Sequence, residues 1–398
     1  MKATEITAIC TGCKCCEAVC PKGAISFKPD SEGFPIPYID ENKCIDCHLC
    51  QNRCPQNTDR FHIDYQRVAV GIKTKNKDLI RHTASGGVFA TLALNVVRNG
   101  GCVVGCAYDS QLVAKHIIVN KEEDLPLLYS SKYVQSDTSG IYIKVKEILE
   151  AGKFVLFSGT GCQSSALKSY LHKPYENLII ADIICHGIPS PLLFKKYCEW
   201  LSGKYKSQVS YVEFRSKYPK GWGQTLRIDT GKNDSRKSHY MFGRCDRYYQ
   251  AYLKGKLHRF SCYYCKYNGD NRASDLTMGD FWNILKCDPD FHDYWGVSEV
   301  VVNSRKGYDF LKKNLSLFDV IETDMKTLES GNANLVHPDR MPECRSQLTR
   351  IMGLPANELF KSSYFKLSQI NYVKDRLIFM LPVALKTALK RLIYTIRK

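Results

Sequence analysis

The sequence lacks the long apolar segments that mark membrane and secreted proteins. No apolar run reaches the roughly 18 residues that a membrane-spanning helix needs. The start, MKATEITAICTGC, has no apolar core of the kind found in secretory signals. Hydrophobic residues make up 44% of the chain and charged residues 24%, so it does not have the composition of a disordered protein. We therefore expect a folded protein of the cytoplasm.

Acidic residues are scarce relative to basic ones. Asp and Glu together number 40 against 57 Lys and Arg, which gives a net charge of +17. Such an excess attracts phosphorylated cofactors, anionic lipid, acidic proteins or nucleic acid. Charge alone does not choose among these partners; we expect no nucleic-acid partner.

Cysteine, in contrast, is abundant. The chain has 19 cysteines and no sign of export, a combination that favours metal ligation or redox chemistry over a disulfide framework. A length of 398 residues exceeds what one hydrophobic core usually supports, so two or three domains are expected.

Eight of the cysteines form an internal repeat near the start of the chain. The pattern C-x2-C-x2-C-x3-C-P occurs twice, over residues 10–21 and 44–55. This spacing is typical of ferredoxins with two [4Fe–4S] clusters, in which the fourth cysteine of each run ligates the other cluster. We therefore expect two clusters, with these ligands: Cys10, Cys13, Cys16 and Cys54 for one, and Cys44, Cys47, Cys50 and Cys20 for the other.

Two alternatives accompany the repeat. Zinc also accepts four thiolates, but zinc sites rarely use this triple spacing. Cys15 lies outside the repeat, because Leu49 occupies the equivalent position in the second run. It is expected to be a packed free thiol rather than a ligand.

The remainder of the chain alternates between strand-like and helix-like segments from about residue 66. FVLFSGTGCQSSALKSYL and LIIADIICHGIPSPLLFKKYCEWL each combine an apolar strand, a turn and a helix. This alternation favours an α/β domain, and residues 205–260 are expected to form an inserted hairpin and loops. The expected fold class is mixed, α+β and α/β, with a two-cluster ferredoxin-like module followed by the larger α/β domain.

Four further cysteines make candidates for a third cluster, namely Cys162, Cys185, Cys262 and Cys265. The first two follow predicted strands, where open α/β sheets place ligand sites. The alternatives are that these two are buried small residues and that CYYC is a zinc or redox pair. The turns HTASGGVFA and SGTGCQ each suit phosphate binding at a helix N-terminus, although small residues also permit tight helix packing.

Several motifs in order resemble one known family. SGGVFATLAL, SGTGCQSSALKSYL, ADIICHGIPSPLLFKKY, CYYCKYNGDNRASDLTMGDFWNI and GVSEVVVNSRKG resemble the family of coenzyme F420 hydrogenase/dehydrogenase beta subunits over residues 65–310. A ferredoxin module in front of this domain is common in the family. The resemblance implies FAD beside iron–sulfur clusters, and it strengthens the case for the third cluster. It also suggests which residues border the flavin: Ser85, Gly86, Gly87, Thr160 and Gly161.

The function implied is an iron–sulfur flavoprotein oxidoreductase that exchanges electrons with a redox partner protein and an organic substrate, either an F420-like deazaflavin or a compound reduced with ferredoxin electrons. His186 and Asp280 are candidate catalytic residues, although both suit structural roles. Arg215, Lys217 and Lys220 are either a receptor for an acidic substrate tail or a solvated basic loop. Two further hypotheses are a non-catalytic electron relay and a zinc-stabilised interaction protein.

The expected domains are residues 1–60 for the ferredoxin module, 65–310 for the larger domain and 311–398 for a C-terminal extension. The last 27 residues carry seven basic side chains against Asp375, and their apolar residues recur at helical spacing. This pattern suits a basic amphipathic helix that contacts anionic lipid, so peripheral membrane contact is a further prediction. The alternative is a helix that docks on protein, and Pro382 interrupts the pattern.

Overall fold

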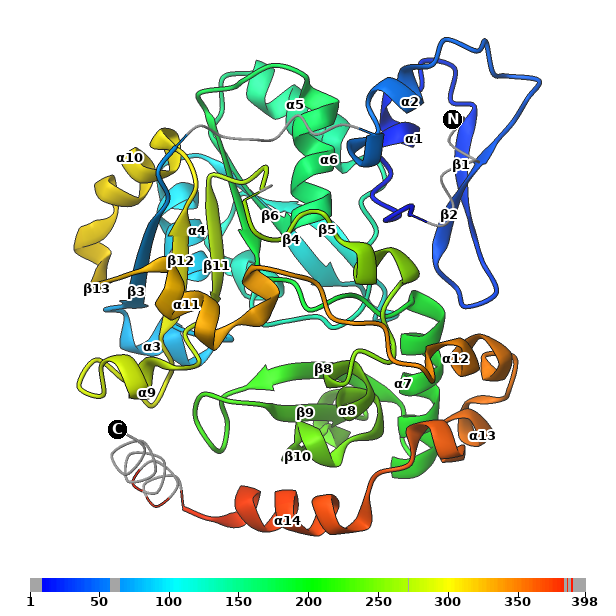
Figure 1. Cartoon of the computed structure of the whole chain (residues 1–398), viewed down its shortest axis with the longest axis vertical. Helices are drawn as coiled ribbons and strands as arrows, with labels where there is room; N and C mark the ends of the chain where they lie inside the picture. Colours follow the sequence, from blue (N-terminus) through cyan, green and yellow to red (C-terminus); the bar gives the residue numbers. More distant parts are fainter. Residues whose placement is uncertain (1–8, 58–64, 271, 383–384, 386–387, 389–398) are drawn as a thin grey trace.

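The structure is a computed structural model that describes residues 9–57, 65–270 and 272–382, together with 385 and 388. The ferredoxin-like module lies beside the larger domain (Figure 1). It consists of helices α1 (Cys15–Val19) and α2 (Leu49–Asn52) and of an antiparallel hairpin, β1 (Ile25–Pro29) and β2 (Pro35–Ile39). Each helix lies within one of the two cysteine runs, and the hairpin lies between the runs.

An eight-stranded mixed sheet forms the centre of the larger domain. Its strand order is β13-β3-β12-β11-β7-β6-β4-β5, and β11, β7, β6 and β4 are parallel neighbours. The strands are β3 (Val68–Thr74), β4 (Cys102–Tyr108), β5 (Ala114–Val119), β6 (Val155–Thr160), β7 (Leu178–Ile183), β11 (Leu276–Asp280), β12 (Ser298–Val302) and β13 (Phe318–Thr323). The mixed α/β class with a ferredoxin-like module, expected from the sequence, is confirmed.

Helices cover both faces of this sheet. Alternate residues of β6 enter different cores: Leu156 packs with residues of α4 and α10, whereas Val155 and Phe157 pack with α5 and α6. The helices of this domain are α3 (Lys77–Arg81), α4 (Val88–Arg98), α5 (Ile141–Glu150), α6 (Gly161–Leu171), α9 (Ile284–Cys287), α10 (Arg305–Lys313) and α11 (Met325–Gly331). Apolar runs in the central strands therefore reflect burial on two sides.

A second, smaller sheet lies below the first in Figure 1. Its strands are β8 (Val209–Ser216), β9 (Thr225–Thr230) and β10 (Lys237–Phe242), in the antiparallel order β10-β9-β8. Helices α7 (Pro191–Tyr205), α8 (Arg247–Leu253), α12 (Arg345–Ile351) and α13 (Ala356–Lys361) share its core. Residues 205–260 are thus more regular than the hairpin and loops expected, because alternate residues such as Val212, Phe214 and Ile228 are buried.

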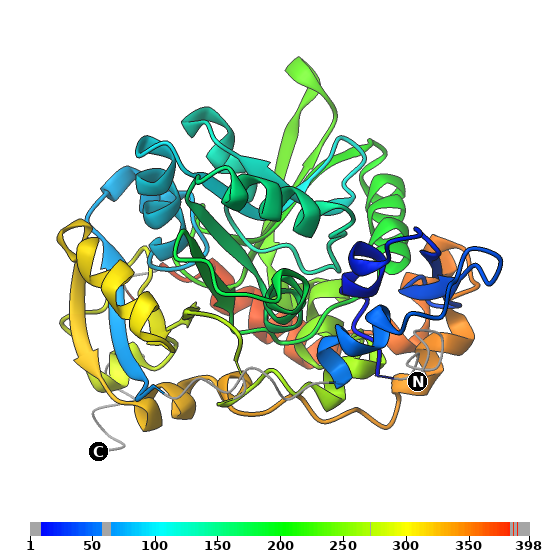
Figure 2. The same ribbon diagram turned by 90° about the horizontal axis from the view of Figure 1, so that it is seen from above.

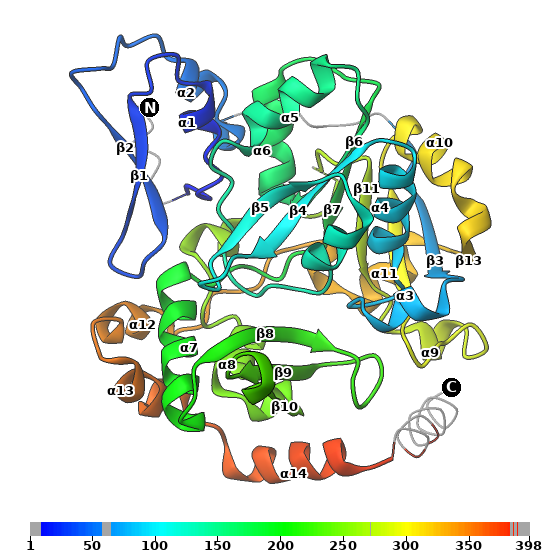
Figure 3. The ribbon, with the colours of Figure 1, turned by 180° about the vertical axis from the view of Figure 1, so that it is seen from behind.

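The larger domain does not end at residue 310, where the sequence placed its boundary. Strand β13 pairs with β3 in antiparallel register, and α12 and α13 pack against α7 and α8. Much of the expected C-terminal extension therefore belongs to the folded body, which Figures 2 and 3 show from above and from behind.

The predicted basic tail is described only in part. Helix α14 (Gln369–Met380) carries Lys374 and Arg376, whereas the other expected cationic positions, Lys386, Lys390, Arg391, Arg397 and Lys398, lie outside the described residues. Within the described part of the chain, no helix is both long and apolar enough to span a membrane.

A buried ion pair connects the ferredoxin-like module to the larger domain. Glu32, at the turn between β1 and β2, accepts two hydrogen bonds from the Arg345 guanidinium, at 2.9 and 2.6 Å. Both side chains are almost fully buried, and Thr349 also donates to the Glu32 carboxylate. The hairpin is therefore anchored to α12 by charge as well as by shape.

We expect Glu32→Gln to destabilise the protein. Removing one charge leaves the Arg345 guanidinium buried without its counter-ion, which costs on the order of 3 kcal/mol. Anaerobic thermal unfolding followed by near-ultraviolet circular dichroism should show a clearly lower midpoint. Glu41→Gln, at an exposed position, is the matched control and should unfold as the wild type does. Equal midpoints for the two variants would contradict this role for the pair.

Candidate functional site

Each ferredoxin-type run folds into the same tight loop. Gly12 and Asp46 have positive φ angles of 67° and 52°, and Lys14 and His48 have 61° and 58°. These are equivalent positions of the two runs, so the repeat in sequence is a repeat in backbone conformation. The left-handed turns direct three cysteines of each run toward one point.

The eight cysteines gather into two groups of four. Each group borders a small cavity. One cavity is lined by Cys10, Cys13, Cys16 and Cys54, together with Cys15 and Cys50, and the other by Cys20, Cys44, Cys47 and Cys50. These are the crossed sets that the spacing predicts. The Gly12 and Ala24 amides donate to the sulfurs of Cys10 and Cys20, at 3.4 and 3.3 Å. Such N–H···S contacts suit thiolates that bind an iron–sulfur cluster.

Cys15 is a packed thiol. Its side chain is fully buried, and its Sγ–H donates to the Arg53 carbonyl oxygen at 3.3 Å. Burial raises the pKa of this thiol to about 12, so it is protonated at neutral pH.

The four cysteines of the larger domain come together from three segments. Cys162 lies in the first turn of α6, Cys185 follows β7, and Cys262 lies in the 3-10 helix Phe260–Tyr264, just before Cys265. Burial raises the pKa of Cys185, and the neighbouring thiols of Cys262 and Cys162 raise it further. Burial likewise raises the pKa of Cys262 to about 12, with Cys265 as the next cause. The four sulfurs are therefore close enough to interact.

Hydrogen bonds hold the first cysteine loop against this inner group. Arg259 Nε donates to the Cys10 carbonyl oxygen at 2.6 Å, and Thr138 and Tyr142 donate to the Cys13 carbonyl oxygen at 3.0 and 2.8 Å. Gln135 donates to the carbonyl oxygen of Thr11 at 3.1 Å. The first cysteine set thus lies next to the inner cysteines.

Tyr267 lies between these two cysteine groups. Its phenol accepts a hydrogen bond from Gln56 Nε2, which follows the first repeat, at 3.1 Å. Burial raises the pKa of Tyr267, and the thiols of Cys13 and Cys162 raise it further.

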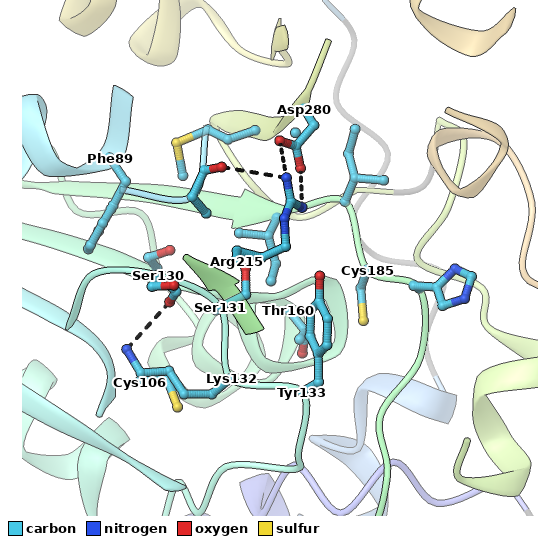
Figure 4. A pocket seen from close by; sticks show the side chains of 18 of the residues that line it. Phe89, Cys106, Ser130, Ser131, Lys132, Tyr133, Thr160, Cys185, Arg215 and Asp280 are labelled. Carbon is cyan, nitrogen blue, oxygen red and sulfur yellow. Dashed lines mark hydrogen bonds and ion pairs between the residues drawn. The ribbon is translucent and has the colours of Figure 1, made fainter. Parts of the chain in front are cut away.

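A pocket of about 520 Å³ lies at the carboxyl ends of the parallel strands, and the first cysteine loop reaches its wall at Thr11, Gly12 and Cys13. Cys162 and Cys185 form part of its wall, as Figure 4 shows for Cys185. The sequence-predicted residues that line it are Ser85, Gly87, Thr160, His186 and Asp280.

Gly86 and Gly161, also expected to border a flavin, do not line this pocket. A Cβ on Gly86 would lie 2.5 Å from the Ile72 carbonyl oxygen, and one on Gly161 would lie 2.9 Å from Tyr267 Cβ. Both positions need glycine because another part of the chain packs directly against the backbone. A flavin contact at these two residues stays a prediction.

The candidate catalytic carboxylate is not free. Arg215 binds both oxygens of Asp280, at 2.7 and 2.8 Å (Figure 4). Trp222 Nε1 donates to the same carboxylate at 2.6 Å. With this arrangement Asp280 orients Arg215 in the pocket wall, and its oxygens are already occupied as acceptors.

The second candidate, His186, is held by a neighbouring amide. Its Nδ1 lies 2.9 Å from Asn334 Oδ1, and its Nε2 lies 3.3 Å from Asp339 Oδ2. Its side chain is about one-quarter exposed. His186 lies at the pocket wall with a fixed orientation.

The basic segment at 215–220 is not the solvated loop considered from the sequence. Lys217 is buried, and its Nζ donates to the carbonyl oxygens of Ile80 and Ser85, both at 2.5 Å. Lys220 lies over the Phe379 ring. Arg215 and Lys217 therefore donate hydrogen bonds to other residues of the protein and stabilise the pocket wall.

Lys132 is a pocket residue that the sequence did not reveal. Its ammonium donates to the carbonyl oxygens of Tyr129, Leu127 and Ser130, at 2.7, 3.0 and 3.4 Å. Burial lowers the pKa of Lys132 to about 8. The segment YSSKYVQS has no motif that marks this lysine, because its role depends on how the loop after β5 folds back over the sheet.

Two family models match separate parts of the chain. Residues 152–325 match the family described as the C terminus of the coenzyme F420 hydrogenase/dehydrogenase beta subunit, and residues 9–58 match the 4Fe-4S dicluster domain. The chain is 35% identical to an uncharacterized ferredoxin of Methanocaldococcus jannaschii over 69 residues, which are 17% of this chain and 78% of that protein.

Two further similarities concern subunits of enzyme complexes. The F subunit of the F420H2 dehydrogenase of Methanosarcina mazei is 22% identical over 187 residues, 44% of this chain. The match spans about half of that relative's length, 53%. A solved chain of the F420-reducing [NiFe] hydrogenase complex from Methanosarcina barkeri is 14% identical, with a TM-score of 0.45, and the match covers 73% of this chain and 90% of that one.

Lys217 gives a pH-dependent prediction. Burial lowers the pKa of Lys217 to about 7, whereas in the unfolded chain the pKa is about 10.4. Between these values the unfolded state binds more protons, so the free energy of unfolding rises with pH, by at most about 1.4 kcal/mol per pH unit. We expect Lys217→Met to lose this rise in thermal scans between pH 7 and 9.

The matched control is Lys237→Met, at an exposed position of β10. It should keep the wild-type pH dependence. The same pH dependence in wild type and Lys217→Met would show that Lys217 is not the titrating group.

Proposed function

Because this chain belongs to the family of coenzyme F420 hydrogenase/dehydrogenase beta subunits and carries a 4Fe-4S dicluster domain, we propose that it is an iron–sulfur flavoprotein oxidoreductase. The observation that carries the proposal is the presence of three neighbouring cysteine groups, two of which reach the wall of the 520 Å³ pocket, through Cys13 and through Cys162 and Cys185. The flavin would supply the exchange between a two-electron hydride and the single electrons that iron–sulfur clusters carry.

The residues present fit three iron–sulfur clusters. The module supplies two sets of four thiols, and the inner group supplies a third set: Cys162, Cys185, Cys262 and Cys265. The Gly187 amide donates to the Cys185 sulfur at 3.4 Å, as the Gly12 amide does for Cys10. The four thiols are half-buried, and neighbouring thiols raise the pKa of Cys185, Cys262 and Cys265. Such a group suits a ligand that replaces the protons of its thiols with metal ions.

The pocket also fits a flavin. A volume of about 520 Å³ lies within the range typical of cofactor sites. Ser85 and Gly87 precede α4, and Thr160 caps α6, so amides of two helix N-termini are available to an anionic group. Lys132 adds positive charge to the wall, whereas Asp280 offsets the charge of Arg215. We propose that FAD binds here, with Ser85, Gly87 and Thr160 among its contacts.

The cysteine groups indicate where a redox partner would bind. Cys44 and Cys47 are exposed, whereas the first set lies against the larger domain. We propose that a partner protein, such as a ferredoxin or another subunit of a dehydrogenase, approaches the module at Cys44 and Cys47. The pocket is left for the organic substrate, and F420H2 is the first compound to test because one relative is a subunit of F420H2 dehydrogenase.

The competing function is a non-catalytic electron relay within a larger complex. It shares the cysteine groups but needs no substrate in the pocket. The two functions differ in one property: an enzyme's flavin is reoxidised or reduced by a free organic compound, whereas a relay responds to its partner alone.

The compartment we propose is a reducing cytoplasm. All nineteen cysteines are free thiols in the structure. Iron–sulfur ligation requires them in that state.

The composition of the purified protein tests the cofactors. We expect about twelve irons per chain and one FAD after anaerobic purification, and about eight irons in Cys185→Ser, because the inner set loses one of its four ligands. Cys287→Ser, at an exposed position, is the control and should keep the wild-type iron content. Eight irons in the wild type would contradict the third cluster. Absence of flavin after reconstitution would favour the electron relay over the enzyme.

A membrane contact rests on the exposed face of α14. Ile370, Val373, Leu377 and Met380 are 82, 53, 59 and 67% exposed, at helical spacing. The opposite side packs on the protein: Asp375 is buried, and the Phe379 ring stacks on Phe242. On the helix surface, Lys374 lies to one side of this apolar stripe and Arg376 to the other. An outward-facing apolar stripe with basic flanks suits an anionic lipid surface.

We expect the full chain to co-sediment with liposomes that contain anionic lipid and to lose this binding when Ile370, Val373 and Leu377 are all changed to Ser. The loss follows from the smaller apolar area available to the bilayer. Changing three exposed apolar residues elsewhere, Val113, Leu127 and Ile143, to Ser is the control. Binding that survives the α14 changes would assign the stripe to a protein partner instead.

A further inference from the structure

Three side chains of the kinds that bind metal ions meet beside the pocket, apart from the cysteine groups. They are His186, His258 and Asp339, and one ligand atom from each lies within 4.8 Å of the others. His186 Nε2 is 3.3 Å from Asp339 Oδ2, and His258 Nε2 is 3.4 Å from the same oxygen. They come from the loop after β7, the segment before Cys262 and the chain that follows α11.

The amide of Asn334 determines which nitrogen of His186 carries its proton. Asn334 Nδ2 donates to Asp339 Oδ1 at 2.9 Å, so its amide oxygen faces His186 and accepts from Nδ1–H at 2.9 Å. The Nε2 atom of His186 therefore faces Asp339 Oδ2, 3.3 Å away, and it has no hydrogen-bond partner among the described residues. A cation between the two atoms would interact favourably with both.

This arrangement is the one that metal-binding histidines adopt. A histidine ligand usually donates its other ring N–H to an oxygen acceptor, which fixes both tautomer and ring orientation. Asn334 does this for His186 and also holds the second oxygen of Asp339. The supporting contacts of a metal site are thus already in place around two of the three residues.

The distances from Asp339 to the two histidines fit tetrahedral coordination. Bonds of about 2.0–2.1 Å to nitrogen and oxygen give ligand-to-ligand distances of roughly 3.3–3.4 Å around a tetrahedral ion. The two measured distances, 3.3 and 3.4 Å, have these values. Two imidazoles and one carboxylate form a donor set typical of Zn²⁺ with one open position.

His258 is rigidly placed. It is 1% exposed, and Arg345 donates to its carbonyl oxygen from two nitrogens, at 3.0 and 2.8 Å. Gly187 has a φ of 113°, and a Cβ there would lie 2.5 Å from the His258 ring. Burial favours a neutral imidazole, the form that binds metal.

We propose that His186, His258 and Asp339 bind one zinc ion, which joins three distant segments at the pocket wall. The fourth position falls to water, because His186 and Asp339 are 27 and 25% exposed and the site opens to solvent. This site goes beyond the proposed function, because none of its ligands is a cysteine of the proposed iron–sulfur clusters. It makes His186 a ligand rather than a proton donor.

Metal content tests the site. The full chain is purified anaerobically, incubated with one equivalent of Zn²⁺ and desalted, and zinc and iron are measured together. We expect about one zinc per chain in the wild type and little in Asp339→Asn, with iron unchanged. Asp309→Asn, which changes an exposed carboxylate of α10, should keep its zinc. His186→Gln serves as a second variant if Asp339→Asn does not fold.

X-ray absorption at the zinc edge separates this site from zinc bound by cysteines. Nitrogen and oxygen neighbours at about 2.0–2.1 Å are expected, whereas thiolate sulfurs would appear at about 2.3 Å. A wild type that retains no zinc, a sulfur shell, or zinc retained in both ligand variants would overturn the proposal.

Discussion

The position of the first cysteine loop depends on its hydrogen bonds with the larger domain. Arg259, Gln135, Thr138 and Tyr142 donate to four consecutive backbone carbonyl oxygens, those of residues 10, 11 and 13 and, through a longer contact of Gln135, of residue 12. These donors recognise the backbone of the cysteine loop. They fix its distance from the inner cysteines, and the ion pair of Glu32 with Arg345 fixes the hairpin on the other side.

Arg259 has an additional electrostatic role. Its side chain is buried, and its partners are the oxygens of Cys10, Pro35 and Gln135; among the described residues no carboxylate is paired with it. A buried cation needs a nearby anion. Its charge favours the ionised form of Cys162 and so opposes the effect of burial on the pKa of that thiol. Thiolates on both sides of Arg259 would supply the missing negative charge, which is consistent with cluster sites in both positions.

The sequence predicts those parts of the site whose geometry is local. The repeat is an example, because spacing of two and three residues alone brings three cysteines of a run together, and the crossing of Cys20 and Cys54 follows from the ferredoxin pattern. The inner group is harder to predict, since Cys162 and Cys265 are about a hundred positions apart and meet only when the sheet forms. The positions of Cys162 and Cys185 after predicted strands made the group a candidate, and the resemblance of the motifs strengthened the case for it.

Other residues were missed or misread for physical reasons. A glycine in a turn can allow either a ligand or another part of the chain to approach the backbone closely. At Gly86 and Gly161 the close neighbours are Ile72 and Tyr267, which the sequence does not reveal. Lys132 and Lys217 are buried by loop contacts that leave no periodic signal. Asp339 lies in a segment that the sequence assigned to an extension, so its meeting with His186 and His258 could not be predicted without the chain's path after β13.

The most direct test of the central claim is anaerobic reduction of the full chain by a one-electron donor, with the module's clusters followed by electron paramagnetic resonance and the flavin by absorbance. If the inner cysteines connect the module to the pocket, the wild type should reduce both. Cys265→Ser should then reduce the module's clusters while its flavin stays oxidised, yet still accept a hydride from a free donor. Equally fast flavin reduction in wild type and variant would contradict the account.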